Sequence, residues 1–154
     1  MRELTTRSKP RTTPRLLFNT MKKDISRLGA VIQARYSSQR LPGKVLERIK
    51  GKSMLEHLIA RIETVLDKSA IILATSNEAS DDPIAEVAKR CQVRLFRGSL
   101  NDVLDRFYQA ALIFQLDPII RITGDNPLLE TVYLRGLIRL YTETDADYAT
   151  AKNP

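Results

Sequence analysis

The sequence predicts an α/β fold, in which helices cover both faces of a mostly parallel sheet. Three observations support this class: short apolar runs typical of buried strands, longer segments with apolar residues at helical spacing, and a regular alternation of the two. Helices that connect successive strands act as right-handed crossovers, which make neighbouring strands parallel. A chain of 154 residues has room for one such domain with a substantial core.

The first elements are two apolar strands with a helix between them. Residues 29–34 and 70–75 are short, nearly continuous apolar runs, as expected of strands that are buried on both faces. Residues 53–66 are predicted to be helical, because their apolar residues fall on one face. Ser53 and Glu56 have the spacing of a capping box, which places the start of this helix.

The alternation continues to the end of the chain. A helix is predicted to start at Asp82, because Asp82 and Pro83 are a preferred cap and a preferred first-turn residue. The remaining predicted elements are a strand at 93–96, a helix at 102–115, a strand at 118–123, a helix at 129–142 and a fifth strand at 147–151.

Charge is spread unevenly along the sequence. The chain has 25 basic and 18 acidic residues, and residues 1–28 hold eight of the basic but only two of the acidic ones. We expect residues 1–27 to be a disordered basic extension, with Met21 as the natural start, and residues 28–154 to form the domain. A nucleic-acid binder needs its basic groups clustered on the domain, so nucleic-acid binding is not expected.

Hydropathy and cysteine content exclude other classes. No apolar run approaches the roughly 18 residues of a membrane span, so no membrane association is expected. One cysteine cannot form an internal disulfide, and one cysteine with one histidine does not make a usual zinc site. A reducing compartment is consistent with this composition, and we expect a cytoplasmic protein.

In open parallel sheets, ligands bind beyond the carboxyl ends of the strands. The segment after the first strand holds Arg35, Arg40 and Lys44, with Pro42 and Gly43 shaping the turn. Arginine forks and a lysine point charge can surround a triphosphate, which makes this a candidate phosphate site built from side chains. It matches neither a Walker A loop nor the dinucleotide glycine fingerprint, and the alternative is a solvated surface loop.

A carboxylate follows the fourth strand in the segment Thr123-Gly124-Asp125. Asp125 at a strand end is well placed to hold a Mg²⁺ ion that bridges phosphates. The alternative is that Asp125 only caps a turn. The two segments are complementary, since one would bind a polyphosphate and the other its metal.

Several motifs together resemble a known family. The segment from Gln33-Ala34-Arg35 to Arg40-Leu41-Pro42-Gly43-Lys44-Val45-Leu46 resembles the signature of cytidylyltransferases that activate acidic sugars. These are the acylneuraminate and 3-deoxy-manno-octulosonate enzymes and their spore-coat polysaccharide relatives, and the spore-coat branch is the closest. The likeness also covers residues 74–76, 81–84, 96–99, 102–106 and 121–125.

The resemblance implies a Rossmann-like, nucleotide-diphospho-sugar transferase fold and the Mg²⁺-dependent reaction of CTP with a sugar to give a CMP-sugar and pyrophosphate. It implies that Arg35, Arg40 and Lys44 hold the triphosphate and stabilise the departing pyrophosphate, and that Asp125 binds Mg²⁺. The nucleotide-binding set that it implies is Ala34, Arg35, Arg40, Lys44, Ala74, Thr75, Ser76, Gly98, Ser99, Asp105 and Arg106.

Two alternatives stay open beside this enzyme. Family members are longer, and their later part supplies a second metal-binding carboxylate, sugar contacts and much of a homodimer interface. The chain is therefore alternatively expected to be a truncated, non-catalytic nucleotide-binding fragment. A glycosyltransferase of the same fold class is the other alternative, although such enzymes usually hold their metal with an Asp-x-Asp pair, and Asp125 stands alone at its strand end.

Overall fold

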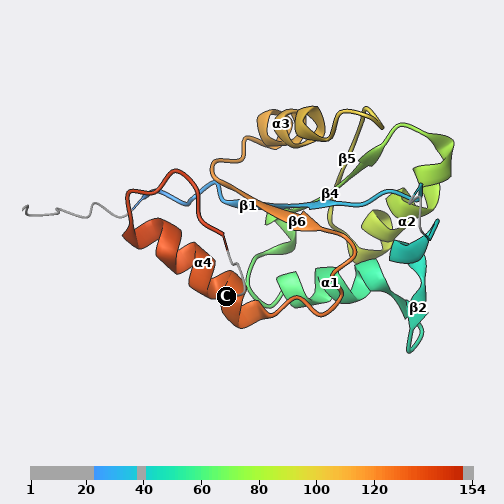
Figure 1. Ribbon diagram of the computed structural model, residues 1–154, viewed down its shortest axis with the longest axis horizontal. Coiled ribbons are helices and arrows are strands. Elements are labelled where there is room, and N and C mark those ends of the chain that lie inside the picture. The colour runs from blue at the N-terminus through green and yellow to red at the C-terminus, as the bar shows by residue number, and fades with distance from the viewer. Residues whose placement is uncertain (1–22, 38–40, 151–154) are drawn as a thin grey trace, which may run out of the picture.

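The structure is a computed structural model that describes residues 23–37 and 41–150. Residues 1–22, where most of the expected disordered extension falls, and Arg40 of the expected phosphate site lie outside the described residues. Figure 1 shows a sheet with helices above and below it.

A parallel sheet of four strands forms the centre of the domain. Its strands stand in the order β5-β4-β1-β6, and all three pairings are parallel. Their bounds are Gly29–Gln33 for β1, Ile71–Ser76 for β4, Arg94–Gly98 for β5 and Ile119–Thr123 for β6. The predicted fold class is confirmed, and each of the four strands falls within two residues of its predicted place.

Alternate residues of the central strands point to opposite faces of the sheet, and each face has its own helices. On one face, Ile32 and Leu73 pack in a cluster with residues of α1 (Met54–Ile62), α2 (Asp82–Cys91) and α4 (Thr131–Glu143). On the other face, Val31 and Ile72 pack with Phe107 and Ala110 of α3 (Val103–Phe114). Figure 1 shows α3 alone above the sheet, with α1 and α4 below it. Both faces of β1 and β4 are therefore buried, as their apolar sequences predicted.

The helices agree with the predictions except at their ends. Helix α1 has the predicted capping box, but it ends at Ile62 rather than at residue 66, because residues 63–66 form turns. The prediction that Asp82 caps α2 is wrong. Asp82 is the first helical residue, and Asp81 stands at the N-cap without a side-chain cap bond.

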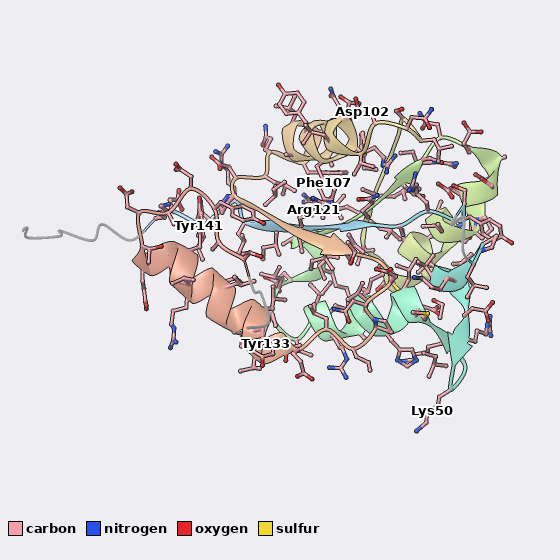
Figure 2. The ribbon with its side chains drawn as sticks, viewed as in Figure 1. Lys50, Asp102, Phe107, Arg121, Tyr133 and Tyr141 are labelled. Carbon is pink, nitrogen blue, oxygen red and sulfur yellow. The ribbon has the colours of Figure 1, made fainter. Side chains whose placement is uncertain are left out.

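The predicted strand at 147–151 is absent from its described part, residues 147–150. A strand needs a partner edge within hydrogen-bonding reach. Residues 147–150 instead line a groove of about 910 Å³, together with β6 and the apolar side chains of α3 and α4. Among the described residues β6 pairs with β1 alone, so its second edge faces this groove. The side of the groove next to α3 holds Arg121, whose guanidinium lies over the Phe107 ring, 5.4 Å from its centroid (Figure 2).

Residues 48–53 form a small antiparallel hairpin that the sequence analysis missed. Its strands, β2 (Arg48–Ile49) and β3 (Lys52–Ser53), have two residues each, which is too short for an alternation of apolar and polar side chains to be visible. Lys50 and Gly51 both have positive φ, 48° and 84°, as the turn of a tight hairpin requires. Lys50 points into solvent at the tip (Figure 2).

The folded domain begins before residue 28. The backbone N–H of Lys23 donates to the Thr142 carbonyl at the end of α4 at 3.3 Å, and the Lys23 ammonium lies 4.4 Å from the centroid of the Tyr141 ring. Arg27 pairs with Asp117 at 3.2 Å. Residues 23–27 are thus attached to the domain, contrary to the predicted boundary. No helix in the described part of the chain is long and apolar enough to cross a membrane.

The capping box of α1 gives a stability prediction. The Glu56 N–H donates to Ser53 Oγ at 3.2 Å, and the Ser53 N–H donates to Glu56 Oε2 at 2.6 Å. We expect Ser53→Ala to lower the free energy of unfolding by about 1 kcal/mol, because one helix N–H loses its acceptor. Denaturant unfolding measures this, with the exposed Ser80→Ala as control. Equal unfolding midpoints for Ser53→Ala and the unaltered chain would contradict the assignment.

Candidate functional site

The order in which strands are added to the sheet reverses at β1. From β1 the chain moves outward to β4 and then to β5, whereas β6 pairs on the opposite side of β1. The carboxyl ends of β1 and β6 therefore lie side by side at a topological switch point, where ligands bind in open α/β sheets. The two segments that the sequence singled out, the one with Lys44 and the one with Asp125, leave the sheet at this point.

Gly124 brings the segment after β6 against the end of β1. Its backbone N–H donates to the Gln33 carbonyl at 2.8 Å, which continues the pairing of the two strands. A Cβ atom at this position would lie 2.9 Å from the same carbonyl oxygen and 3.0 Å from the Leu55 side chain. A glycine is therefore needed for the close approach. The approach places Asp125 directly beside the segment after β1.

Lys44 and Asp125 contact each other across this junction. Lys44 Nζ lies 2.9 Å from Asp125 Oδ2, and the side chains are 36% and 48% exposed. Gly43 has a φ of 72° and donates its N–H to the Tyr36 carbonyl at 2.8 Å, a turn that starts the short 3-10 helix Lys44–Leu46. The hydrogen bond from Lys44 lowers the pKa of the Asp125 carboxyl, against a smaller opposing effect of burial. Asp125 is therefore an accessible carboxylate at neutral pH.

Arg35 and Arg106 form a second positive centre, beside the segment that follows β5. The half-buried Arg35 follows the buried Ala34 directly, and its Nη1 donates to the Leu100 carbonyl at 3.4 Å. Arg106 is fully buried in the first turns of α3, and its Nη1 donates to the carbonyls of Ser99 and, at 3.0 Å, Leu100. The two guanidinium groups thus share one carbonyl.

The Arg106 guanidinium has unused donors. Within the described residues its Nε and Nη2 have no hydrogen-bond partner. Burial lowers the pKa of Arg106, and the positive charge of Arg35 lowers it further. Two neighbouring cations, of which Arg106 has unused donors, favour a ligand that is anionic or rich in oxygen acceptors.

The other expected nucleotide-binding residues make contacts of their own. Ser99 Oγ accepts from the Asn101 and Asp102 N–H groups, and Asp105 Oδ1 accepts from Gln109 on the next turn of α3. Gly98 ends β5 and packs closely on Arg106, whose Cγ would lie 3.0 Å from a Cβ atom at Gly98. Gly98 and Ser99 therefore lie directly against Arg106, whereas Asp105 contacts its own helix.

Thr75 and Ser76, at the end of β4 after Ala74, are fully buried with their hydroxyls directed at Asp81. Asp81 also accepts from the backbone N–H of Tyr36, at 2.7 Å. Asp81 was not predicted as a site residue, because the helix cap was assigned to Asp82 beside it. The family-like motif at residues 81–84 was the available signal, but it does not show which of the two carboxylates is buried.

The residues present fit a magnesium ion that is coordinated partly by the protein and partly by the phosphate oxygens of a bound molecule. Asp125 offers hard, charged oxygen atoms, which Mg²⁺ prefers. Within residues 23–37 and 41–150 no group of three or more His, Cys, Asp or Glu side chains is close enough to hold a metal. Mg²⁺ commonly binds through one or two carboxylates with water and phosphate oxygens as its other ligands. The site fits a metal that arrives with a polyphosphate better than one held by protein alone.

Comparisons with known proteins agree with this arrangement. The chain is similar to the spore coat polysaccharide biosynthesis protein SpsF of Bacillus subtilis, with 35% identity over 80% of this chain and 53% of SpsF. It is similar in structure to a cytidylyltransferase from Leptospira borgpetersenii, with a TM-score of 0.71, 35% identity and coverage of 74% and 48%. A CMP:2-keto-3-deoxy-manno-octonic acid synthetase complexed with CTP gives a TM-score of 0.63, 26% identity and coverage of 74% and 46%.

The chain spans about half the length of the curated relatives that it matches. A family model described as cytidylyltransferase matches residues 30–154, which include the four-stranded sheet apart from Gly29, the first residue of β1, and the carboxyl ends of all four strands. The match covers most of the chain, and it contains both the basic segment after β1 and the carboxylate after β6. The chain belongs to the cytidylyltransferase family.

Proposed function

We propose that the chain binds CTP and forms the nucleotide-binding part of a Mg²⁺-dependent cytidylyltransferase that activates a sugar for polysaccharide synthesis. The observation that carries this proposal is the junction of Lys44 with Asp125 at the switch point of the sheet. This contact brings the candidate phosphate-binding cation, Lys44, next to the candidate metal ligand, Asp125. Membership of the family and the similarity to a synthetase complexed with CTP support cytosine as the base.

The reaction that we propose is a transfer of CMP. A sugar hydroxyl oxygen forms a bond to the α-phosphorus of CTP, and the bond from that phosphorus to the oxygen bridging to the β-phosphate breaks. Pyrophosphate leaves with this oxygen, and the hydroxyl proton is released to solvent. Arg35, Arg40 and Lys44 hold the triphosphate and offset the charge that develops on pyrophosphate. Such catalysis depends chiefly on alignment and on preorganised charge.

Asp125 would hold Mg²⁺ together with phosphate oxygens, and the ion would neutralise part of the triphosphate charge. Lys44 bonds to the same carboxylate in the free chain, so we propose that Lys44 turns to the phosphates when nucleotide and metal bind. By its similarity to SpsF and to 3-deoxy-manno-octulosonate cytidylyltransferases, the substrate that we propose is an acidic sugar of a surface or spore-coat polysaccharide. A cytoplasmic location, where CTP is available, and a homodimer complete the proposal.

Pyrophosphate release tests the enzyme. We expect release from CTP and Mg²⁺ with an acidic sugar such as 3-deoxy-manno-octulosonate, and less with UTP in place of CTP. A second candidate for the chain is nucleotide binding without turnover. CTP binding in calorimetry without release from any sugar would select this candidate. Preference for a nucleoside diphosphate-sugar over CTP would indicate a glycosyltransferase instead.

A charge-removal variant tests the triphosphate contact. We expect Arg40→Ala to weaken CTP binding about ten- to a hundredfold, and CMP binding much less, because CMP lacks the β- and γ-phosphates that a guanidinium would bind. Calorimetry with both nucleotides measures the difference. The control is Arg139→Ala, an exposed arginine on α4. Equal losses of affinity for CTP and CMP would show that Arg40 does not bind the β- and γ-phosphates.

The metal assignment is tested at Asp125. We expect Asp125→Asn to remove most of the gain in CTP affinity that Mg²⁺ provides, because the amide is a poorer metal ligand. Without Mg²⁺, CTP affinity should be unchanged or slightly higher, since Lys44 is released from its carboxylate partner. Titrations with and without Mg²⁺ measure both effects, with the exposed Glu143→Gln on α4 as control. An undiminished Mg²⁺ effect would remove Asp125 from the metal site.

A further inference from the structure

Asp81 is a fully buried carboxylate that no part of the proposed reaction uses. Four donors surround it: the Tyr36 N–H at 2.7 Å, the Ser76 N–H and the Thr75 hydroxyl at 2.9 Å each, and the Ser76 hydroxyl. No ion pair joins Asp81 to a basic side chain in the part of the chain that the structure describes. Hydrogen bonds are therefore the direct compensation for the burial of its charge, to which the nearby Arg106 cation adds a longer-range attraction.

The two backbone contacts favour a carboxylate. Oδ1 accepts from the Tyr36 N–H and Oδ2 from the Ser76 N–H, so the NH₂ of an amide would face a backbone donor in either orientation. Burial alone raises the pKa of Asp81, but the hydrogen bonds from Ser76, Tyr36 and Thr75 outweigh this effect and keep the pKa below its usual value. The carboxylate is thus the form that the surrounding groups stabilise.

The contact joins two segments of the candidate site that are distant in sequence. Thr75 and Ser76 end β4, whereas Tyr36 follows Arg35 in the segment after β1. The backbone of Tyr36 is held on both sides, because its N–H donates to Asp81 and its carbonyl accepts from the Gly43 N–H at 2.8 Å. Arg35 directly precedes Tyr36 and Lys44 directly follows Gly43, so these two hydrogen bonds fix the backbone next to both cations.

Asp81 stands at the N-cap of α2 but makes no cap bond to its own helix. Aspartate at this position usually accepts from an N–H group of the first helical turn. Here the carboxylate is directed away from the helix, toward β4 and the segment after β1. The local helix signal therefore does not explain its conformation, whereas the tertiary contact does.

We propose that Asp81 is a positioning residue for the triphosphate. By holding the backbone of Tyr36, it keeps Arg35 and Lys44 in the arrangement that binds the phosphates. Thr75 and Ser76 act in this arrangement by orienting Asp81 rather than by touching the nucleotide. The inference rests on the proposed function, since the ligand is the nucleoside triphosphate proposed there.

The test uses Asp81→Asn in the full chain, with and without nucleotide. We expect the Tyr36 amide hydrogen to exchange with solvent at least about tenfold faster in the free variant, because its acceptor is weakened. We expect CTP affinity in calorimetry to fall about tenfold, as for the loss of a charge-assisted hydrogen bond, and CMP affinity to fall less. The matched control is Glu86→Gln, an exposed carboxylate on the same helix, which should change neither quantity.

A double-mutant cycle separates indirect from direct roles of Thr75. If Thr75 acts through Asp81, Thr75→Val should weaken CTP binding in the unaltered chain but have little further effect in Asp81→Asn. Additive effects would overturn this part of the proposal. Should Asp81→Asn fail to fold, Ser76→Ala removes one donor and keeps the carboxylate. It should then speed exchange at Tyr36 and weaken CTP binding about threefold.

The remaining outcomes are distinguishable. Thermal unfolding shows whether each variant is folded at the temperature of the titration. A folded Asp81→Asn chain with faster exchange at Tyr36 and undiminished CTP affinity would overturn the positioning role and leave a purely structural one. If the unaltered chain does not bind CTP, the proposed function fails. Exchange at Tyr36 would then still show whether Asp81 anchors the segment after β1.

Discussion

The pairing of β1 with β4 on one side and β6 on the other is the constraint on which the rest of the structure depends. It buries both faces of β1 and assigns the helices to their layers. It also creates the switch point, because the chain must return across β1 to form β6. The cationic segment and Asp125 are more than 80 residues apart in sequence, and only this return brings Lys44 within 2.9 Å of the carboxylate.

Charge is organised differently at the surface and in the interior of the site. The accessible pair of Lys44 and Asp125 is exposed to water, so it adds little stability and can exchange its partners for a ligand. Asp81 and Arg106 are fully buried, where an uncompensated charge is costly. Asp81 is satisfied by four donors, whereas Arg106 keeps two nitrogens without partners in the described residues. The hydrogen bonds to Asp81 stabilise one conformation of the site, whereas the unpaired nitrogens of Arg106 favour a ligand that brings hydrogen-bond acceptors.

The polar end of the sheet and the groove at its open edge are separate features of the domain. The groove is lined largely by apolar side chains of β6, α3 and α4, and it lies along the strand that is paired on one side only among the described residues. The nucleotide-binding residues expected from the resemblance lie instead at the carboxyl ends of β4 and β5, on the segments that follow β1 and β5, and in the first turn of α3. Substitutions in the groove and at the strand ends should therefore be separable in experiments.

Local patterns in the sequence determined the elements and the segments in which to look for chemistry. The apolar runs of β1 and β4 and the capping box of Ser53 depend on neighbours within a few residues, so they were readable directly. The expected strand at 147–151 failed in residues 147–150, because a strand also needs a partner edge, which local sequence does not contain. Asp81 was not singled out beside the cap predicted at Asp82, since its decisive partner, Tyr36, lies 45 residues away. Tertiary structure alone decided which carboxylate is buried, which cation meets Asp125 and where the two arginines converge, because these contacts arise only when the sheet brings its strand ends together.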